Sequence, residues 1–192
     1  PSMDDVIGQE QAKRALTIAI AGHHNILLTG PPGTGKTMLA QTALGLLPDL
    51  TDQEVLEVSK IYGLTMNTSD IHYDRPFRSP HHTASKISVV GGGPKAVPGE
   101  ISLAHLGVLF LDEMPEYPRS VLESLRQPME DKKITITRVN RTSTYPANFM
   151  LIATMNPCPC GYLGDETKDC SCTSTQILNY QRKISGPPLD RI

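Results

Sequence analysis

The residues with the clearest chemical meaning form a glycine-rich loop that ends in a lysine and a threonine, Gly-Pro-Pro-Gly-Thr-Gly-Lys-Thr. Glycines let the backbone turn so that successive N–H groups point at one anion, and a following helix adds the positive end of its dipole. Lys36 would reach the outer phosphates of a nucleotide, and the Thr37 hydroxyl would hold Mg²⁺. The predicted phosphate-binding residues are Gly30, Pro31, Pro32, Gly33, Thr34, Gly35, Lys36 and Thr37.

The alternative interpretation of this loop is a glycine-rich turn that binds nothing. Phosphate binding is favoured because an apolar, strand-like run precedes the loop at residues 25 to 29 and a helical run follows it at residues 38 to 47. A strand, a phosphate loop and a helix in this order are what nucleotide binding requires.

An acidic pair follows a second apolar run, at residues 107 to 111. Parallel strands bind ligands at their carboxyl ends, so Asp112 is expected to hold Mg²⁺ opposite the phosphate loop, and Glu113 to act as general base on the attacking water. The alternative is that the pair only caps a helix. A third apolar run, residues 149 to 154, ends near Asn156, which could orient the water or contact the γ-phosphate.

All four cysteines fall within one short loop, residues 158 to 172, as two Cys-x-Cys pairs. Four thiolates suit a closed tetrahedral Zn²⁺ site, although Cys-x-Cys is less typical than Cys-x-x-Cys. Free thiols or a redox-sensitive pair are the alternatives. The polar residues between the pairs cannot form a core, so a metal would order this loop. The candidate ligands are Cys158, Cys160, Cys170 and Cys172.

Positioning these groups requires parallel strands interleaved with helices. Strands are expected at residues 25 to 29, 107 to 111 and 149 to 154, with helices at 11 to 21, 38 to 47, 51 to 61, 99 to 105, 119 to 127 and 174 to 185. A short β-type run is expected at residues 86 to 90 and a hairpin at residues 131 to 145. The pattern predicts an α/β protein with a parallel sheet flanked by helices and right-handed crossovers.

Three further segments are candidates for contacts. Val6 and Ile7 precede the first helix and could touch an adenine ring or belong to the core. The irregular segment from 64 to 99 carries Arg75 and Arg78 and is either a polyanion contact or a solvated loop. The hairpin is also basic. The candidate DNA contacts are Lys86, Lys95, Lys132, Lys133, Arg138 and Arg141.

Length and composition limit the class of protein. A chain of 192 residues is long enough for one domain with its own core. It contains neither a membrane-spanning run nor a leader-like start, so we expect a cytoplasmic protein without membrane contact. A formal net charge of -2 argues against a generally basic coat, so DNA contact would come from local patches. The ends of the chain suggest a piece of a longer protein.

Together these motifs resemble those of AAA+ ATPases. Residues 30 to 37, 108 to 113 and Asn156 resemble the Walker A, Walker B and sensor 1 elements. Four more stretches, which include His81-His82 and Cys158-Pro159-Cys160, resemble the magnesium-chelatase-like ComM/YifB group: residues 75 to 82, 99 to 105, 156 to 161 and 185 to 192. The resemblance covers essentially the whole chain.

The resemblance implies an AAA+ core over residues 1 to 192, with strand order 5-1-4-3-2 and without the lid and the N-terminal Lon-like domain. It implies a helix-2 insert at residues 85 to 98 and a pre-sensor 1 hairpin at 131 to 145, both pointing into a central pore. It also implies hexameric rings with ATP between subunits, in which Arg191 acts in trans as the arginine finger, and DNA branch migration in natural transformation.

Three functions follow as hypotheses. The first is an ATP-driven motor that acts on single-stranded or branched DNA, and the second is a magnesium-chelatase-like ATPase subunit that remodels a protein. The third, a nucleotide-binding scaffold with little turnover, needs no general base, so Lys36, Asp112 and Glu113 argue against it. The cysteine loop and the paired histidines favour the DNA motor over the second hypothesis.

Overall fold

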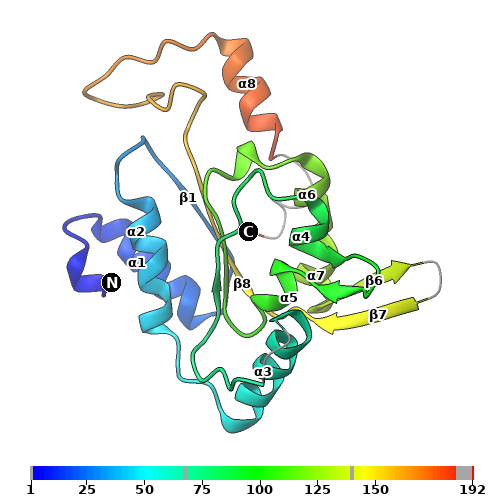
Figure 1. Cartoon of the computed structure of the whole chain (residues 1–192). Coiled ribbons are helices and arrows are strands. Elements are labelled where there is room, and N and C mark those ends of the chain that lie inside the picture. Colours follow the sequence, from blue (N-terminus) through cyan, green and yellow to red (C-terminus); the bar gives the residue numbers. More distant parts are fainter. Residues whose placement is uncertain (1, 67–68, 139–140, 185–191) are drawn as a thin grey trace.

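The fold is built on a parallel sheet with helices on both faces (Figure 1). The computed structural model describes residues 2–66, 69–138, 141–184 and 192, except for the side chains of Arg138 and Arg141. The sheet has four strands in the order β1-β8-β5-β2. Their bounds are β1 (Ile26–Thr29), β8 (Met150–Met155), β5 (Val108–Leu111) and β2 (Phe77–Arg78).

The two central strands are apolar along their whole length because both of their faces are covered. Every residue of β5 and β8 is buried. Alternate residues belong to different cores: Phe110 and Ile152 pack in one cluster, whereas Leu111 and Ala153 pack in the other. An unbroken apolar run is the expected pattern for a parallel strand covered on both sides.

The three predicted strands are confirmed, and the strand order agrees in part with the expected 5-1-4-3-2. Counted along the chain, the four sheet strands lie in the order 1-4-3-2. No strand flanks β1 on its outer side within the described ranges. The edge strand β2 has only two residues, too few for a periodic pattern, and was not predicted.

Helices on one face of the sheet hold the phosphate loop, and helices on the other face support the acidic pair. The first group is α1 (Glu10–Ala21), α2 (Lys36–Gln41) and the 3-10 helix η2 (Thr42–Leu46); the second is α4 (Lys86–Val90), α5 (Glu100–Leu103), α6 (Arg119–Ser124) and α7 (Arg126–Asp131). The rest are η1 (Met3–Asp5), η3 (Met114–Glu116), α3 (Asp52–Met66) and α8 (Ser174–Arg182). None of the helices in the described ranges combines the length and apolar character needed to cross a bilayer.

Two predictions of local structure were wrong. Residues 86 to 90, expected as a β-type run, form helix α4, because Ser85 caps it and accepts a hydrogen bond from the Ser88 N–H at 3.1 Å. Short apolar runs do not distinguish a helix from a strand by periodicity. The helix expected to end before Pro128 continues as α7, in which Pro128 is the third residue. A proline in the first turn removes an N–H that has no partner within the helix.

The predicted hairpin is confirmed, and it extends away from the sheet (Figure 1). Its strands are β6 (Lys133–Arg138) and β7 (Arg141–Pro146). Its base packs against a small antiparallel ribbon, β3 (Gly91–Gly92) with β4 (Val97–Pro98). The Tyr145 hydroxyl donates to the Ala96 carbonyl at 2.7 Å, so hairpin and ribbon form one unit.

Candidate nucleotide-binding site

The phosphate loop joins β1 to α2 at the carboxyl edge of the sheet. Gly33 and Gly35 both have φ +78°, a left-handed conformation that glycine adopts without steric strain. The Thr34 hydroxyl donates to the Pro31 carbonyl at 2.9 Å and closes the turn. Glycines at these two positions therefore allow the compact curve that phosphate binding requires.

Lys36 lies between the loop and the neighbouring strand. Its Nζ donates to the carbonyl oxygens of Gly30 and Pro31, both at 2.7 Å, and lies 3.4 Å from Asn156 Oδ1. Burial lowers the pKa of Lys36, while Asp112 and Glu113 act in the opposite direction. The structure thus places Lys36 beside Asn156 and close to the acidic pair, as predicted for a phosphate-binding lysine.

Oxygen atoms from the first turn of α2 and from the ends of β5 and β8 meet at the edge of the sheet. The Thr37 hydroxyl lies 3.2 Å from Asp112 Oδ2, and the Thr154 hydroxyl donates to Asp112 Oδ1 at 2.6 Å. Hydroxyl and carboxylate oxygens are hard ligands of the kind that Mg²⁺ prefers. The predicted pair Thr37 and Asp112 therefore fits this ion.

Thr154 is a site residue that the sequence analysis missed. It is fully buried, and besides binding Asp112 it accepts the Glu113 N–H at 3.0 Å. The register pairs Leu111 with Ala153, so Asp112 and Thr154 lie side by side at the ends of neighbouring strands. The signal in the sequence that could have identified Thr154 is its lone hydroxyl near the end of an otherwise apolar run.

Glu113 leaves the strand in a left-handed backbone conformation, with φ 53° and ψ 57°. Non-glycine residues in this region cost about 1 kcal/mol or more and concentrate at functional sites. The side chain of Glu113 is exposed, so solvent can reach it. This geometry fits a general base that receives a proton from water.

The cavity beside the phosphate loop has a volume of about 260 Å³, and Gln9 and Ala12 of the N-terminal segment line it. The Gln9 amide donates to the Thr34 carbonyl at 3.4 Å. Val6 packs in the core, whereas Ile7 is 95% exposed, and neither lines this cavity. The adenine contact assigned to them stays a prediction.

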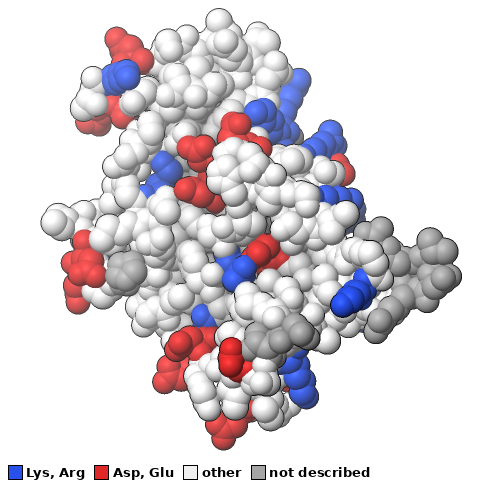
Figure 2. All heavy atoms as spheres, in the orientation of Figure 1, with Lys and Arg blue, Asp and Glu red and all other residues white. Residues whose placement is uncertain are grey.

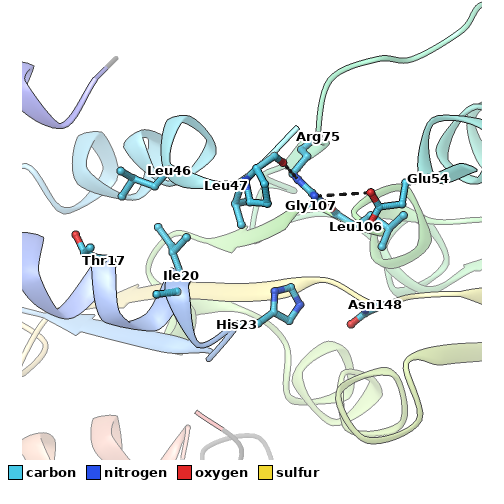
Figure 3. A pocket seen from close by; sticks show the side chains of 12 residues that line it. Thr17, Ile20, His23, Leu46, Leu47, Glu54, Arg75, Leu106, Gly107 and Asn148 are labelled. Atoms are coloured by element: carbon cyan, nitrogen blue, oxygen red, sulfur yellow. Dashed lines mark hydrogen bonds and ion pairs between the residues drawn. The ribbon is translucent and has the colours of Figure 1, made fainter. Parts of the chain in front are cut away.

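A larger cavity, of about 490 Å³, lies at the amino ends of the strands (Figure 3). Arg75 borders it and donates to the Leu106 carbonyl at 2.6 Å. Arg78, the second arginine of that motif, forms a bidentate pair with Glu100 at 2.6 and 2.8 Å. Both arginines therefore bind groups within the protein. This indicates a structural role and argues against binding of a polyanion.

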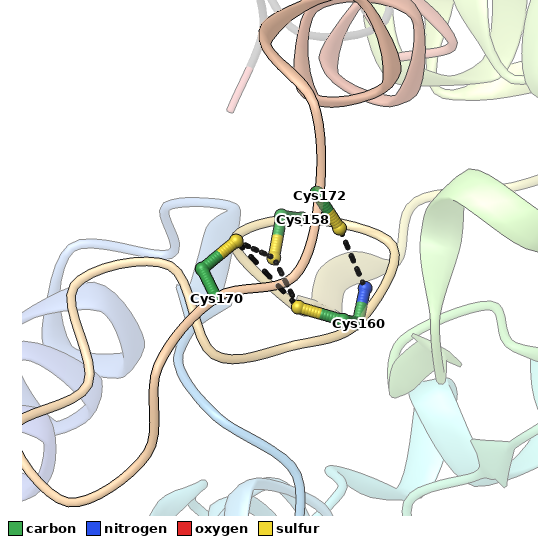
Figure 4. A group of neighbouring side chains, drawn as sticks. All are labelled: Cys158, Cys160, Cys170 and Cys172. Carbon is green, nitrogen blue, oxygen red and sulfur yellow. Dashed lines mark hydrogen bonds between the residues drawn. The ribbon is translucent and has the colours of Figure 1, made fainter.

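The four cysteines come together at one point (Figure 4). Their sulfur atoms all lie within 4.8 Å of one another, with Cys158 at 3.4 Å from Cys160 and 3.7 Å from Cys170. A tetrahedral site with Zn–S bonds of about 2.3 Å has sulfur atoms about 3.8 Å apart. Backbone N–H groups, that of Tyr162 first, lower the pKa of Cys160 to about 5, whereas burial and the neighbouring thiols outweigh the backbone hydrogen bonds and raise the pKa values of Cys170 and Cys172.

The candidate DNA contacts lie on the hairpin and on the segment beside it. Lys86, Lys95, Lys132 and Lys133 are exposed. The face drawn in Figure 2 shows basic side chains in small groups among acidic and uncharged ones. The side chains of Arg138 and Arg141 lie outside the described part of the structure, and Arg191 lies outside the described residues.

Comparison with known proteins places this chain in a family. The sequence profile described as magnesium chelatase, subunit ChlI, matches residues 2–192. The chain is 53% identical over 192 residues to competence protein ComM of Haemophilus influenzae, and 54% identical over 193 residues to the uncharacterized protein YifB of Escherichia coli. Each alignment covers 98% of this chain and 37% of the relative, so the chain spans little more than a third of their length.

Solved structures show the same fold at low sequence identity. The complex between subunits BchI and BchD of magnesium chelatase, based on single-particle cryo-electron microscopy, matches with a TM-score of 0.63 at 20% identity, over 96% of this chain and 67% of that one. NtrX from Brucella abortus in complex with ADP matches with a TM-score of 0.53 at 20% identity, over 78% of this chain and 30% of that one. These likenesses confirm the AAA+ core fold.

Proposed function

Because this chain belongs to the magnesium chelatase subunit ChlI family of AAA+ proteins, we propose that it binds and hydrolyses ATP with Mg²⁺ as the core of a ring-forming cytoplasmic motor that acts on DNA. The observation that carries the ATPase proposal is the convergence of Lys36, Thr37, Asp112 and Asn156 at one edge of the sheet. The residues form a hydrolysis site rather than a simple binding turn.

The phosphate loop binds and positions the nucleotide. Its backbone N–H groups surround the phosphates, and Lys36 compensates the negative charge of the outer ones. Bound by Thr37 and Asp112, Mg²⁺ would neutralise charge that develops on the phosphates. Thr154 supports this arrangement, since its hydroxyl fixes the Asp112 carboxylate at 2.6 Å.

Glu113 is the proposed general base and Asn156 the proposed sensor of the γ-phosphate. The exposed Glu113 carboxylate takes the proton of the attacking water. Asn156, 3.4 Å from Lys36 Nζ, orients that water or contacts the terminal phosphate. Arg191 supplies the arginine finger to the site of a neighbouring subunit, where it stabilises the negative charge of the transition state.

The DNA part of the proposal rests on the hairpin β6–β7, the ribbon beside it and the family relationship. Four exposed lysines lie on or next to these elements, and positive side chains bind the phosphate backbone without regard to sequence. We assign these elements as the pre-sensor 1 hairpin and the helix-2 insert of a hexameric ring, where they would meet single-stranded or branched DNA. The relative named a competence protein supports branch migration in natural transformation.

The alternative is a protein-remodelling ATPase subunit, as in magnesium chelatase. It is favoured by the likeness to the complex of subunits BchI and BchD, with a TM-score of 0.63. In that case the hairpin and ribbon would contact a protein, and DNA would not change the ATPase rate.

We further propose that the four cysteines hold a structural Zn²⁺. The cluster has the number, type and spacing of ligands that a closed tetrahedral site needs. The sulfur atoms of Cys158, Cys160 and Cys170 are 3.4 to 3.7 Å apart, close to the value of about 3.8 Å expected for such a site, and all four lie within 4.8 Å of one another.

The test is the ATPase rate of the complete protein with and without single-stranded and branched DNA at low salt. We expect DNA to stimulate the rate. Lys36→Ala should abolish nucleotide binding, whereas Glu113→Gln should keep binding and lose about 10²-fold or more in turnover. Equal loss of binding in both variants would contradict the assigned roles, and a rate unaffected by DNA, with no gel shift, would favour the protein-remodelling alternative.

A further inference from the structure

The cysteine loop touches the nucleotide site at Gly161. This residue is buried with φ +88°, and a Cβ added to it would lie 2.7 Å from Pro32 Cδ and 3.8 Å from Asn156 Cγ. Pro32 is part of the phosphate loop, and Asn156 is the proposed sensor. The turn that begins at Cys158 therefore packs directly against two parts of the hydrolysis site.

Both ends of the cysteine loop lead into the core beside the proposed sensor residue. On the incoming side, Asn156 is separated from the buried Cys158 by a single proline. On the outgoing side, Tyr180 of α8 is 7% exposed and packs in the same hydrophobic cluster as Met155, the residue before Asn156. The position of Asn156 thus depends on how residues 158 to 172 are held.

Within the described part of the chain, apolar packing contributes little to holding this loop. The hydrophobic clusters contain Met155 and Tyr180 but no residue between them. The contacts inside the loop are local, such as Asp165 with the Thr167 N–H at 2.7 Å and Lys168 over the Tyr162 ring at 4.0 Å. The sulfur cluster is the feature that joins its two halves (Figure 4).

We propose that Zn²⁺ bound by the four cysteines fixes the turn of residues 158 to 161 against Pro32 and Asn156, so that metal occupancy controls the rate of ATP turnover. This inference rests on the proposed ATPase function. Metal binding replaces thiol protons by bonds to the ion, and it couples directly to the ordering of the loop. Without the metal the turn loses its fixed position, and the sensor side chain loses its support.

The kinetic consequence is specific. Nucleotide affinity depends on Lys36 and the backbone N–H groups of the phosphate loop, whereas turnover depends on the placement of Asn156. The phosphate-loop atoms nearest to Gly161 belong to the ring of Pro32, which has no N–H to offer a phosphate. Misplacement of a positioning group by about 1 Å can reduce a rate by about 10²-fold. Loss of zinc should therefore lower kcat by about tenfold or more and change the Kd for ATP by less than about twofold.

The first experiment compares Cys170→Ser with Cys170→His in the complete protein, purified without chelators. The wild type and Cys170→His should contain one zinc per chain, since histidine is also a zinc ligand, and both should bind Co²⁺ with the absorption of a tetrahedral thiolate site. Cys170→Ser should lose the metal, become sensitive to protease between residues 158 and 172, and lose kcat while it keeps its Kd for ATP.

The second experiment perturbs the contact without touching a ligand. Gly161→Ala should keep its zinc and lose kcat, because the new Cβ would collide with Pro32. Gly164→Ala is the matched control, since Gly164 also has a positive φ, +78°, but has no atom within 4 Å of the added Cβ. Equal effects of the two substitutions would overturn the proposed contact.

The outcomes separate this inference from the proposed function. An active wild type without bound zinc, or one whose kcat survives removal of zinc, overturns the inference and leaves the ATPase function intact. A zinc-loaded wild type that does not hydrolyse ATP with DNA present overturns both. Zinc-dependent turnover with constant nucleotide affinity supports both.

Discussion

At the scale of single residues, the Thr154 hydroxyl holds both members of the acidic pair. It donates to Asp112 at 2.6 Å and accepts the Glu113 N–H at 3.0 Å. Thr154→Val keeps the shape and removes both hydrogen bonds. A buried N–H without a partner costs about 1–3 kcal/mol, so we expect turnover to fall about tenfold or more and the Mg²⁺ concentration for half-maximal rate to rise.

Thr154→Ser is the control for this prediction, because serine keeps the hydroxyl and loses only a methyl group. Steady-state kinetics over a Mg²⁺ titration should place Thr154→Ser close to the wild type. If both variants lost the same activity, packing of the methyl group would be responsible and the hydrogen bonds would not.

Single residues also show how far the sequence could predict this site. Lys36 and Thr37 follow from a local pattern, and Asp112 from its place after an apolar strand. The bond from Thr154 to Asp112 depends on the register between two strands and joins residues 42 positions apart in the chain. The Gly161 contact with Pro32 joins segments still further apart. Local spacing carries no information on either contact, because both arise only when the sheet assembles.

At the scale of elements, the hairpin and the ribbon depend on each other through Gly91. This glycine has φ +104°, and an added Cβ would lie 2.5 Å from Ile136 Cδ1 and 2.6 Å from the Val97 carbonyl oxygen. We expect Gly91→Ala to separate the two elements and lower the free energy of unfolding by about 2 kcal/mol or more, with loss of DNA-stimulated ATPase activity.

Gly93→Ala provides the comparison, since Gly93 has φ +73° but no atom within 4 Å of its added Cβ. Urea unfolding and DNA-stimulated ATPase assays of the two variants separate backbone strain from steric conflict. A Gly93→Ala variant as unstable as Gly91→Ala would show that strain alone is responsible.

A buried histidine links α3 to the segment that precedes β8 and makes stability depend on pH. His105 lies 3.2 Å from Glu57 of α3 through Nε2, and its Nδ1 accepts the Asn148 N–H at 3.1 Å. Burial lowers the pKa of His105, and the bond to Glu57 offsets this only in part. Below the ordinary histidine pKa of about 6.5, the unfolded chain therefore binds more protons than the folded one.

Because the unfolded chain binds more protons, the free energy of unfolding falls as the pH is lowered from about 6.5 to the pKa of His105 in the folded state. For this one group the fall is at most about 1.4 kcal/mol per pH unit. His105→Gln should reduce the slope of unfolding free energy against pH in urea titrations between about pH 5.5 and 7.5. The pKa of His23 is also lowered by burial, so some slope should remain. An unchanged slope would exclude His105 as its source.

The helices and strands also show which features a local sequence pattern can predict and which it cannot. The buried strands were predictable because β5 and β8 are unbroken apolar runs, and the capping box of α3 because Thr51 and Glu54 bond each other's backbone N–H groups at 2.8 and 3.4 Å. Helix α4 was predicted as β structure because Ile87, Val89 and Val90 favour strands in isolation. Packing decided otherwise, since Val89 is fully buried in the core as part of a capped helix.

At the scale of the whole molecule, we propose that the hydrolysis site is shared between two subunits. In this proposal one chain supplies the phosphate loop, Asp112 and Glu113, and the neighbour supplies Arg191. In a head-to-tail ring each interface contains one site, and the two contributions come from different chains. Glu113→Gln and Arg191→Ala should therefore each abolish ATP hydrolysis while leaving ATP binding intact.

Mixing the two inactive proteins tests this geometry directly. In a ring of random composition at equal concentrations, about one quarter of the interfaces join an intact Glu113 to an intact Arg191. The mixture should therefore regain a measurable part of wild-type activity after subunit exchange, with rings observed by native mass spectrometry. The matched control is a mixture of Lys36→Ala and Glu113→Gln. Both substitutions affect the half of the site that one chain supplies, so no pairing of these two chains gives a complete site. Activity in the control, or none in the test mixture despite mixed rings, would refute an arginine finger in trans.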